Sequence, residues 1–184
     1  MRIIRGEAKG RKIQVPREKK LRLTSDRVKE SLFNLLPDME GIFFLELFAG
    51  TGNVSLEALS RGAKRAVLVE KEPAWVTLIG KNLEALGFGE RSEVITGPVE
   101  RVLPFLQERG DRFDIVFADP PYEKGHIAGT LEALGGGEVL KDTGLVVVEH
   151  AIREETGKRY ESLALRDRRR YGDTVLSFFA LDRG

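Results

Sequence analysis

Short apolar segments that alternate with amphipathic segments are the feature that most constrains how this chain of 184 residues folds. These segments are strand-sized and almost continuously apolar, and they cover residues 42–47, 66–69, 94–95, 113–118 and 145–148. Strands buried on both faces have this composition, and intervening helices make neighbouring strands run parallel. We therefore expect a doubly wound α/β domain with a mostly parallel sheet, in which one covering helix opens at Pro73.

The two ends of the chain depart from this alternation. Residues 2–15 have the pattern of a small hairpin that turns through glycine-containing residues 6–10. Residues 162–165 and 174–181 predict an antiparallel hairpin at the sheet edge, separated by the charged stretch RDRRRYGD. Two residues of the central region carry local predictions. Pro104 should interrupt or restart its helix. Trp75 lies on the apolar face of another helix and should be in the core.

Composition excludes several kinds of protein. The chain has no cysteine, which removes disulfides, thiolate zinc sites and a cysteine nucleophile. The two histidines, His126 and His150, have no second ligand nearby in the sequence, so no metal is expected. The apolar runs fall far short of the ~20 residues of a membrane span, and the polar start does not suit a signal peptide. We expect a soluble, cytoplasmic protein with no membrane partner.

The formal net charge of +1 hides an uneven distribution of charge. Residues 1–29 contain eleven Lys or Arg and three Asp or Glu, a net charge of +8, which leaves −7 for the remainder. A basic arm on an acidic body is typical of a protein that binds a polyanion. Composition alone leaves open the alternative that this terminus is merely solvated.

The first motif is the sequence FLELFAGTGNVSLEALSRGA, residues 44–63, which follows the first apolar strand. A glycine-rich turn at this point lets the backbone approach a ligand and aims helix amides at it. The dinucleotide fingerprint G-x-G-x-x-G is imperfect, because Ser55 stands where the third glycine would be. The flanking residues resemble the E/D-x-F-x-G-x-G loop of S-adenosylmethionine methyltransferases. A tight turn without a ligand is the alternative.

Glu70 ends the second strand, 18 residues beyond Gly52. In doubly wound nucleotide-binding folds, an acidic residue at this place and spacing accepts hydrogen bonds from ribose hydroxyls. NAD and S-adenosylmethionine would both use this carboxylate, and a solvated strand end is also compatible with it. Glu70 therefore indicates a nucleoside without deciding which one.

The third motif, Asp119-Pro120-Pro121-Tyr122, follows the fourth strand, at the sheet edge where such folds bind ligands. The lone pair of an amine on a nucleobase is delocalised into the ring, so methylating it requires acceptors that hold both N–H groups. Asp119 and the carbonyl of Pro120 could be these acceptors, while the prolines stiffen the loop. Tyr122 could stack on an extruded base. A Pro-Pro turn would explain the prolines, but not Asp119 and Tyr122 together.

The order of these motifs resembles that of amino-group methyltransferases acting on nucleic acid bases. More narrowly, the whole chain is similar to bacterial 16S rRNA (guanine-N2)-methyltransferases of the RsmD type. The blocks that carry the resemblance are MRIIRGEAKGRKIQVP, LRLTSDRVKESLFNLL, LELFAGTGNVSLEALSRGA, VEKE, DPPY and YGDTVLSFF. Two residues depart from the family pattern: Glu46 stands where aspartate is commoner, and Leu23 replaces a usual proline.

The resemblance implies a class I, Rossmann-like methyltransferase fold with a role for each block. Residues 1–23 would be a basic arm of the same domain, and residues 24–184 the S-adenosylmethionine-dependent methyltransferase domain. The catalytic loop would be Asp119, Pro120, Pro121 and Tyr122. Cofactor binding would involve Glu46, Phe48, Ala49, Gly50, Thr51, Gly52, Asn53, Glu70, Lys71, Pro98 and Val99.

Two further groups of residues would face the substrate. A lid over the cofactor and target base would consist of Thr24, Asp26 and Arg27, although Thr24 and Asp26 also suit a helix N-terminus. The residues expected to contact RNA phosphates are Arg5, Arg11, Lys12, Arg17, Lys19, Lys20 and Arg22. The basic run at residues 166–170 either extends this surface or lies on a solvated hairpin.

The function implied is transfer of a methyl group from S-adenosylmethionine to N2 of a guanine in 16S rRNA, within the free RNA or the assembled small subunit. S-adenosylhomocysteine would be the product, and the enzyme would act as a monomer without a metal. Three alternatives stay open: methylation of DNA adenine or of a protein glutamine, an NAD-dependent oxidoreductase, and a non-catalytic RNA-binding module. The chain leaves no room for the target-recognition domain of a DNA methyltransferase, and a protein substrate would give the basic arm no purpose. Ser55 argues against NAD binding, and the intact DPPY loop argues against a module without catalysis.

Overall fold

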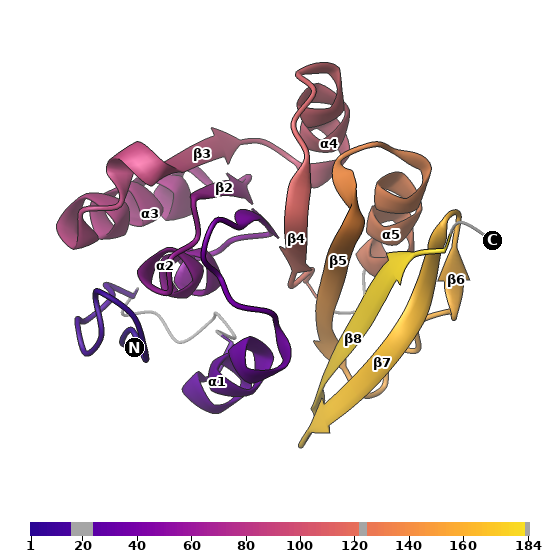
Figure 1. Cartoon of the computed structure of the whole chain (residues 1–184), viewed down its shortest axis with the longest axis horizontal. Helices are drawn as coiled ribbons and strands as arrows, with labels where there is room; N and C mark the ends of the chain where they lie inside the picture. The colour runs from indigo at the N-terminus through magenta and orange to yellow at the C-terminus, as the bar shows by residue number, and fades with distance from the viewer. Residues whose placement is uncertain (16–23, 122–124, 183–184) are drawn as a thin grey trace.

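The computed structural model of the chain describes residues 1–15, 24–121 and 125–182. Its centre is an eight-stranded sheet in the order β3-β2-β1-β4-β5-β8-β7-β6 (Figure 1). The parallel strands are β1 (Phe43–Leu47), β2 (Arg65–Glu70), β3 (Ser92–Thr96), β4 (Phe113–Ala118) and β5 (Leu140–Ala151). The antiparallel strands are β6 (Arg159–Tyr160), β7 (Leu163–Tyr171) and β8 (Thr174–Leu181). The strand order reverses between β1 and β4, which is where such sheets bind ligands.

Helices cover both faces of the sheet. On one face lie α1 (Asp26–Leu35), α2 (Asn53–Ser60) and α3 (Pro73–Leu86), and η1 (Gly89–Arg91) follows α3. On the other face lie α4 (Val99–Glu108) and α5 (His126–Gly136). Alternate strand residues supply the two apolar layers, so that Phe44 and Leu68 pack toward α1–α3 while Leu45 and Val67 pack toward α4 and α5. The predicted α/β fold with an antiparallel C-terminal hairpin is confirmed. No helix in the described ranges is long and apolar enough to cross a membrane.

Two local predictions are wrong. Pro104 lies inside α4, which continues through it. The loss of one backbone hydrogen bond there is offset by the buried apolar face of Val99, Val102, Leu103 and Leu106. The stretch RDRRRY belongs to β7 rather than to a loop, because β7 pairs with β8 as far as Tyr171 and turns only at Gly172, which has φ +64°.

The N-terminal hairpin (residues 1–15) is short, and it packs on α2. An antiparallel bridge joins Arg2 to Lys12, and Ile3, Ala8 and Ile13 are buried in the same core as α2. The turn needs glycine at position 6, because φ is +87° and a Cβ would lie 1.7 Å from the carbonyl oxygen of Ser60. The segment that the charge pattern predicted as an arm thus contributes to the core over these residues.

A buried ion pair lies between this hairpin, α1 and α2. The side chains of Lys29 and Glu57 are fully buried, and Nζ lies 3.3 Å from Oε2. Glu57 accepts hydrogen bonds from the backbone N–H groups of Ile4 (2.8 Å) and Arg5 (3.0 Å). Burial lowers the pKa of Lys29, while the neighbouring Glu57 carboxylate opposes that shift. Lys29, counted with the basic arm in the sequence, is therefore an interior residue.

Candidate active site

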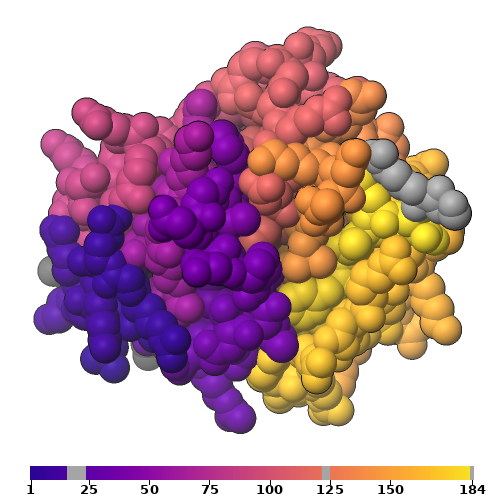
Figure 2. All heavy atoms as spheres, viewed as in Figure 1, coloured from indigo at the N-terminus to yellow at the C-terminus, as the bar shows by residue number. Residues whose placement is uncertain are grey.

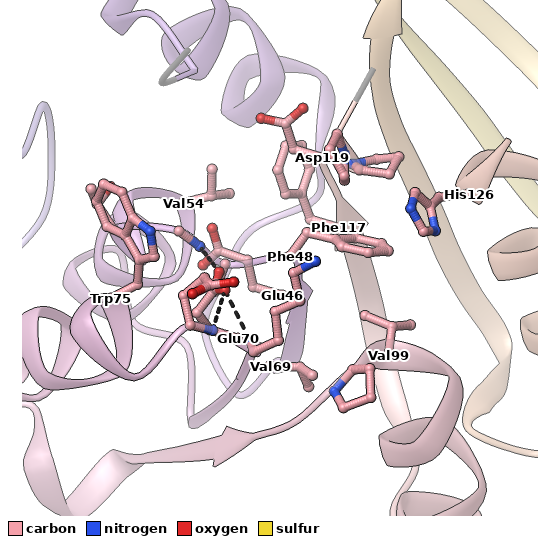
Figure 3. Close-up of a pocket in the computed structure, with 18 of the residues that line it drawn as sticks. Glu46, Phe48, Val54, Val69, Glu70, Trp75, Val99, Phe117, Asp119 and His126 are labelled. Atoms are coloured by element: carbon pink, nitrogen blue, oxygen red, sulfur yellow. Dashed lines mark hydrogen bonds between the residues drawn. The ribbon is translucent and has the colours of Figure 1, made fainter. Parts of the chain in front are cut away.

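A cavity of about 420 Å³ opens at the carboxyl ends of β1, β2 and β4 (Figure 3). This volume lies in the range typical of small-molecule sites. Most of the predicted site residues line it: Thr24, Glu46, Phe48, Ala49, Gly50, Thr51, Asn53, Glu70, Lys71, Pro98, Val99, Asp119, Pro120 and Pro121. The doubly wound topology thus brings together three motifs that are far apart in the sequence.

The loop between β1 and α2 forms the cavity floor through an unusual backbone path. Phe48, Gly50 and Gly52 have φ values of +59°, +55° and +70°, a backbone region that residues other than glycine rarely adopt. Gly52 does not line the cavity; it caps α2, and a Cβ there would lie 2.9 Å from Leu68 Cδ2. The strained Phe48 is held in contact with the His126 ring, with centroids 5.9 Å apart.

Glu70 is fixed at the end of β2 by backbone donors. Its Oε2 accepts from the Gly50 N–H at 2.7 Å, and its Oε1 accepts from the N–H groups of Lys71 (2.8 Å) and Glu72 (3.0 Å). These bonds set the orientation of the carboxylate. Oε1 already accepts two of them, whereas Oε2 accepts one and retains lone-pair capacity for a ligand hydroxyl. Glu70 also ties the glycine loop to the second strand.

Glu46 lies deeper in the cavity wall, on β1. Its Oε2 accepts a hydrogen bond from the Ser55 N–H at 2.8 Å, near the N-terminus of α2. Burial raises the pKa of Glu46 to about 7, despite this hydrogen bond. A cationic group bound beside it would favour the ionised form.

The opposite wall follows β4. Asp119, Pro120 and Pro121 line the cavity there, and Figure 3 shows Asp119 near Phe117. Tyr122, the predicted stacking residue, lies outside the described residues. The rim toward α4 and α5 carries Pro98, Val99 and His126, whose Nδ1 is 3.4 Å from Glu100 Oε1.

The predicted lid residues separate into two places. Thr24 lines the cavity, and its hydroxyl donates to Glu149 Oε2 at 2.7 Å at the end of β5. Asp26 and Arg27 instead line a second cavity, between α1 and the N-terminal hairpin. α1 begins after Ser25, whose Oγ accepts a hydrogen bond from the Val28 N–H at 3.2 Å. The first turn of α1 therefore stands between two cavities.

The prediction that Trp75 lies in the core is wrong. This residue is half-buried in the first turn of α3 and lines the cavity on the side facing away from His126, rather than lying in the core (Figure 3). The apolar helix pattern pointed to the core, but the first turn of a helix that follows Glu70 also faces the ligand edge. Phe117 and Glu100 line the cavity as well and were not predicted, although Phe117 precedes Asp119 by two residues and Glu100 directly follows Val99.

The predicted RNA-contacting residues have different environments. Arg5 and Lys12 are exposed, and their side chains form no ion pair or hydrogen bond within the described residues. Arg11 instead donates to the carbonyls of Ala85 and Leu86 at the end of α3, where a cation suits the helix dipole. Arg17, Lys19, Lys20 and Arg22 lie outside the described residues. Within the described residues, no group of three or more His, Asp or Glu side chains could hold a metal.

Comparison with known proteins extends over nearly the whole chain. The sequence model of the family described as Conserved hypothetical protein 95 matches residues 1–180. Ribosomal RNA small subunit methyltransferase D of Escherichia coli is 39% identical over 153 residues, which cover 83% of this chain and 75% of that protein. The Bacillus subtilis protein YlbH is 31% identical over 180 residues, 97% of this chain and 98% of that one.

Solved structures agree with the sequence matches. The structure of yhhF from Escherichia coli superposes with a TM-score of 0.86 at 32% identity, covering 100% of this chain and 99% of that one. The resemblance inferred from the motifs is confirmed at the level of family. This chain belongs to the Conserved hypothetical protein 95 family, together with the ribosomal RNA small subunit methyltransferase D proteins.

Proposed function

We propose that this protein transfers a methyl group from S-adenosylmethionine to the exocyclic N2 of a guanine in 16S rRNA. The observation that carries the proposal is that one cavity is lined both by the glycine loop with Glu70 and by Asp119-Pro120-Pro121. A nucleoside cofactor and a nucleobase amine could therefore meet within it. Family membership beside small-subunit methyltransferases supports the RNA substrate. Residues 24–184 would form the methyltransferase domain, with residues 1–23 as part of it.

The charge of the cavity fits this cofactor. S-adenosylmethionine carries a sulfonium and an ammonium group, and the cavity wall contains the carboxyl groups of Glu46, Glu70, Glu72, Glu100 and Asp119. Lys71 is the one lysine or arginine among the described lining residues. An acidic cavity of this kind attracts a cationic ligand and disfavours an anionic dinucleotide. The charge balance thus argues against the NAD alternative.

Each wall has a place in this proposal. Glu70 would accept the ribose hydroxyls, since its position is set by three backbone amides. Glu46 would pair with the ammonium group, and the first amides of α2, around Asn53, would face the carboxylate. Pro98 and Val99 would flank the adenine. These contacts would leave the methyl group directed toward Asp119.

When bound, the cofactor supplies an electrophilic methyl group. The chain's own contribution is to orient the guanine amine that receives the methyl group. Asp119 and the Pro120 carbonyl would accept hydrogen bonds from this amine and so direct its nitrogen toward the methyl group. The guanine nitrogen would take this methyl group with S-adenosylhomocysteine as the leaving group, and Asp119 or water would accept the proton that the amine then loses. No covalent enzyme intermediate forms, in keeping with the absence of cysteine. We expect a monomer that acts in the cytoplasm, where small subunits reside.

The test offers methyl-labelled S-adenosylmethionine with undermethylated small subunits, naked 16S rRNA, DNA and protein in separate reactions, followed by mapping of the methyl group. We expect label on N2 of one guanine in 16S rRNA. Asp119→Asn should lower transfer by at least 100-fold with cofactor affinity within about threefold of wild type, because one acceptor is replaced while the cofactor walls remain. Label confined to DNA or protein, or wild-type transfer by Asp119→Asn, would contradict the proposal.

Cofactor binding should also depend on pH through Glu46. Because the pKa of Glu46 is raised to about 7, the carboxyl is mostly neutral at pH 6 and mostly ionised at pH 8. Affinity for S-adenosylmethionine should rise by roughly tenfold over this interval if the ionised form is required. Titration calorimetry at several pH values measures this, with Glu46→Gln as the control that should bind weakly and lose that component of the pH dependence. Equal slopes in the two proteins would exclude Glu46 from the ammonium site.

A further inference from the structure

A second cavity, of about 430 Å³, separates the N-terminal hairpin from α1. We call it the hairpin groove. It is lined by Arg2, Ile3, Ile4, Lys9, Gly10, Asp26, Arg27 and Glu30. Three of these side chains are cationic and two are acidic, and all five of these charged residues are exposed. The groove is therefore a polar, accessible surface.

The cations of the hairpin groove have no partner within the described residues. No ion pair or hydrogen bond there involves the side chain of Arg2, Lys9 or Arg27. Elsewhere in the described chain most arginines are engaged, as in the pairs Arg65–Glu93, Arg91–Glu7, Arg109–Asp111 and Arg112–Glu138. Cations that face one cavity and have no partner among residues 1–15, 24–121 and 125–182 can bind an external anion without breaking a contact within those ranges.

The groove also has a rigid frame. The hairpin backbone is bound to α2 through Glu57 and through Ser60, whose Oγ accepts from Ala8 N–H at 3.0 Å and donates to the Arg5 carbonyl at 2.6 Å. Gln14 and Asn82 exchange two backbone–amide hydrogen bonds, of 2.9 and 3.0 Å, which attach the hairpin to α3. Cations on a fixed scaffold lose less conformational freedom on binding than those on a loose terminus.

A single buried ammonium group links the groove to the active-site cavity. Lys29 Nζ donates to the carbonyl of Arg2, in the groove wall, at 2.9 Å, and to Oδ1 of Asn53, in the cavity wall, at 2.7 Å. The first turn of α1 also has one residue on each side, with Thr24 in the cavity and Arg27 in the groove. A strand whose base enters the cavity at this side would pass its backbone along the groove.

We propose that the hairpin groove binds a ribose–phosphate segment of the substrate RNA, on the strand that carries the target base. This inference rests on the proposed function. Arg2, Lys9 and Arg27 would contact phosphate oxygens, a contribution that positions the strand without reading its sequence. Asp26 and Glu30 would repel a bare phosphate, but they can accept hydrogen bonds from 2′-hydroxyls, the group that distinguishes RNA from DNA.

The test compares two variants with the same loss of charge. Arg2→Gln/Lys9→Gln/Arg27→Gln removes the groove cations. Lys81→Gln/Arg101→Gln/Lys158→Gln removes three exposed cations outside the groove that are also without an ion pair or hydrogen bond within the described ranges. Binding to undermethylated small subunits and to a 16S rRNA fragment is measured between 50 and 300 mM salt.

We expect the groove variant to bind RNA roughly 10- to 100-fold more weakly at 0.15 M salt. The slope of the logarithm of the binding constant against the logarithm of the salt concentration (the salt slope) should fall in magnitude by about 2. The control variant should stay within about threefold of wild type. Both should unfold like wild type and bind S-adenosylmethionine normally. Lys9→Gln alone, with a slope reduction of about 0.7, gives an independent check if the triple variant folds poorly.

Failure of the inference is distinguishable from failure of the proposed function. If wild type methylates 16S rRNA and the groove variant keeps the wild-type affinity and salt slope, the groove does not bind the strand. If wild type leaves rRNA unlabelled, the proposed function is wrong. A DNA oligonucleotide of the same sequence tests the ribose contact: wild type should prefer RNA, and Glu30→Ala should reduce that preference. An unchanged preference would mean that Glu30 does not bind the 2′-hydroxyls.

Discussion

The chain carries a basic hairpin at each end, and the two use their cations in opposite ways. In the N-terminal hairpin, the side chains of Arg2, Arg5, Lys9 and Lys12 form no ion pair or hydrogen bond within the described residues. In the C-terminal hairpin (β7 and β8), Arg169 pairs with Asp167 at 2.7 Å, Arg168 donates to the Thr156 carbonyl at 2.7 Å, and Arg170 donates to the Gly172 carbonyl at 2.8 Å. Figure 2 shows the two hairpins at opposite ends of the molecule.

The two hairpins are also held in place by different forces. β8 joins the sheet through a continuous antiparallel ladder with β5, and Leu176, Phe178 and Phe179 are buried. The N-terminal hairpin has one bridge of its own and depends on α2, through Glu57 and Ser60. A basic stretch of sequence therefore does not by itself identify a surface for nucleic acid. What matters is whether the cations already have partners.

Removing the buried ammonium group of Lys29 should give the largest difference in local stability between the two hairpins. Lys29→Met leaves Glu57, Asn53 and the Arg2 carbonyl without their shared donor, so we expect a loss of about 3–5 kcal/mol in the free energy of unfolding. Urea denaturation measures the loss, and amide hydrogen exchange should show faster exchange at residues 3–13 than in β8. Lys29→Met/Glu57→Gln should recover part of it. A cost below 1 kcal/mol would mean that the ion pair does not hold the hairpin.

The two turn glycines give a matched pair of substitutions. Gly6→Ala places Cβ 1.7 Å from the Ser60 carbonyl oxygen, whereas Gly172→Ala, at φ +64°, has no atom within 4 Å of Cβ. We expect a loss of roughly 3 kcal/mol for Gly6→Ala, from overpacking and backbone strain, and roughly 1 kcal/mol for Gly172→Ala, from strain alone. Unfolding of both variants in the same buffer measures this. Equal costs would show that the N-terminal turn is not packed against α2.

Acidification should weaken the anchor of the C-terminal hairpin. His150 Nδ1 lies 3.0 Å from the Ala151 carbonyl, so Nδ1 carries the proton and Nε2 accepts from the Ser177 hydroxyl at 2.8 Å. Burial lowers the pKa of His150, so folding favours the neutral ring. This stabilisation is fully present above the unfolded-state pKa of about 6.5 and is lost as the pH falls toward the folded-state value.

The measurement is the free energy of unfolding between pH 5 and 8 for wild type and His150→Gln. The variant should lack the part of the acid destabilisation that is due to His150. Using the difference between the two proteins removes the opposite contribution of Glu46, whose pKa, raised to about 7, lowers stability as the pH rises. Parallel pH curves for the two proteins would contradict the assignment of a neutral His150.

The smallest expected effect is on RNA binding by the C-terminal hairpin. Arg169→Gln/Arg170→Gln removes two cations that already have partners within the hairpin, so RNA affinity should change less than twofold and the salt slope should stay at the wild-type value. The stability cost should also be below 1 kcal/mol, because both side chains are exposed. A loss of affinity as large as that of the groove variant would show that both hairpins contact the substrate.

The sequence was most informative where one chemical requirement decided the structure. Pro73 begins α3 because a proline suits the first position of a helix. The glycine loop, Glu70 and the Asp119 loop meet because parallel strands end at the same edge of the sheet. These features could be predicted without any knowledge of tertiary packing.

Prediction was weakest where packing overrode a local preference. Lys29 was counted with the surface cations, because nothing in the sequence shows that Glu57, 28 residues later, faces it in the interior. The charged residues of β7 did not suggest a strand, yet the ladder with β8 supplies their hydrogen bonds. Trp75 could be assigned to the cavity only once the direction of α3 relative to Glu70 was known.

The attachment of the hairpin to α2 has a consequence for synthesis of the chain. Its backbone contacts with α2 join residues 52 to 55 positions apart, such as Ala8 and Arg5 with Ser60. Residues 1–15 leave the ribosomal tunnel before α2, so a nascent chain that ends ahead of α2 cannot bury Ile3, Ala8 or Ile13. During that interval a segment with five Lys or Arg residues and one Glu emerges unfolded, beside the ribosome's own RNA.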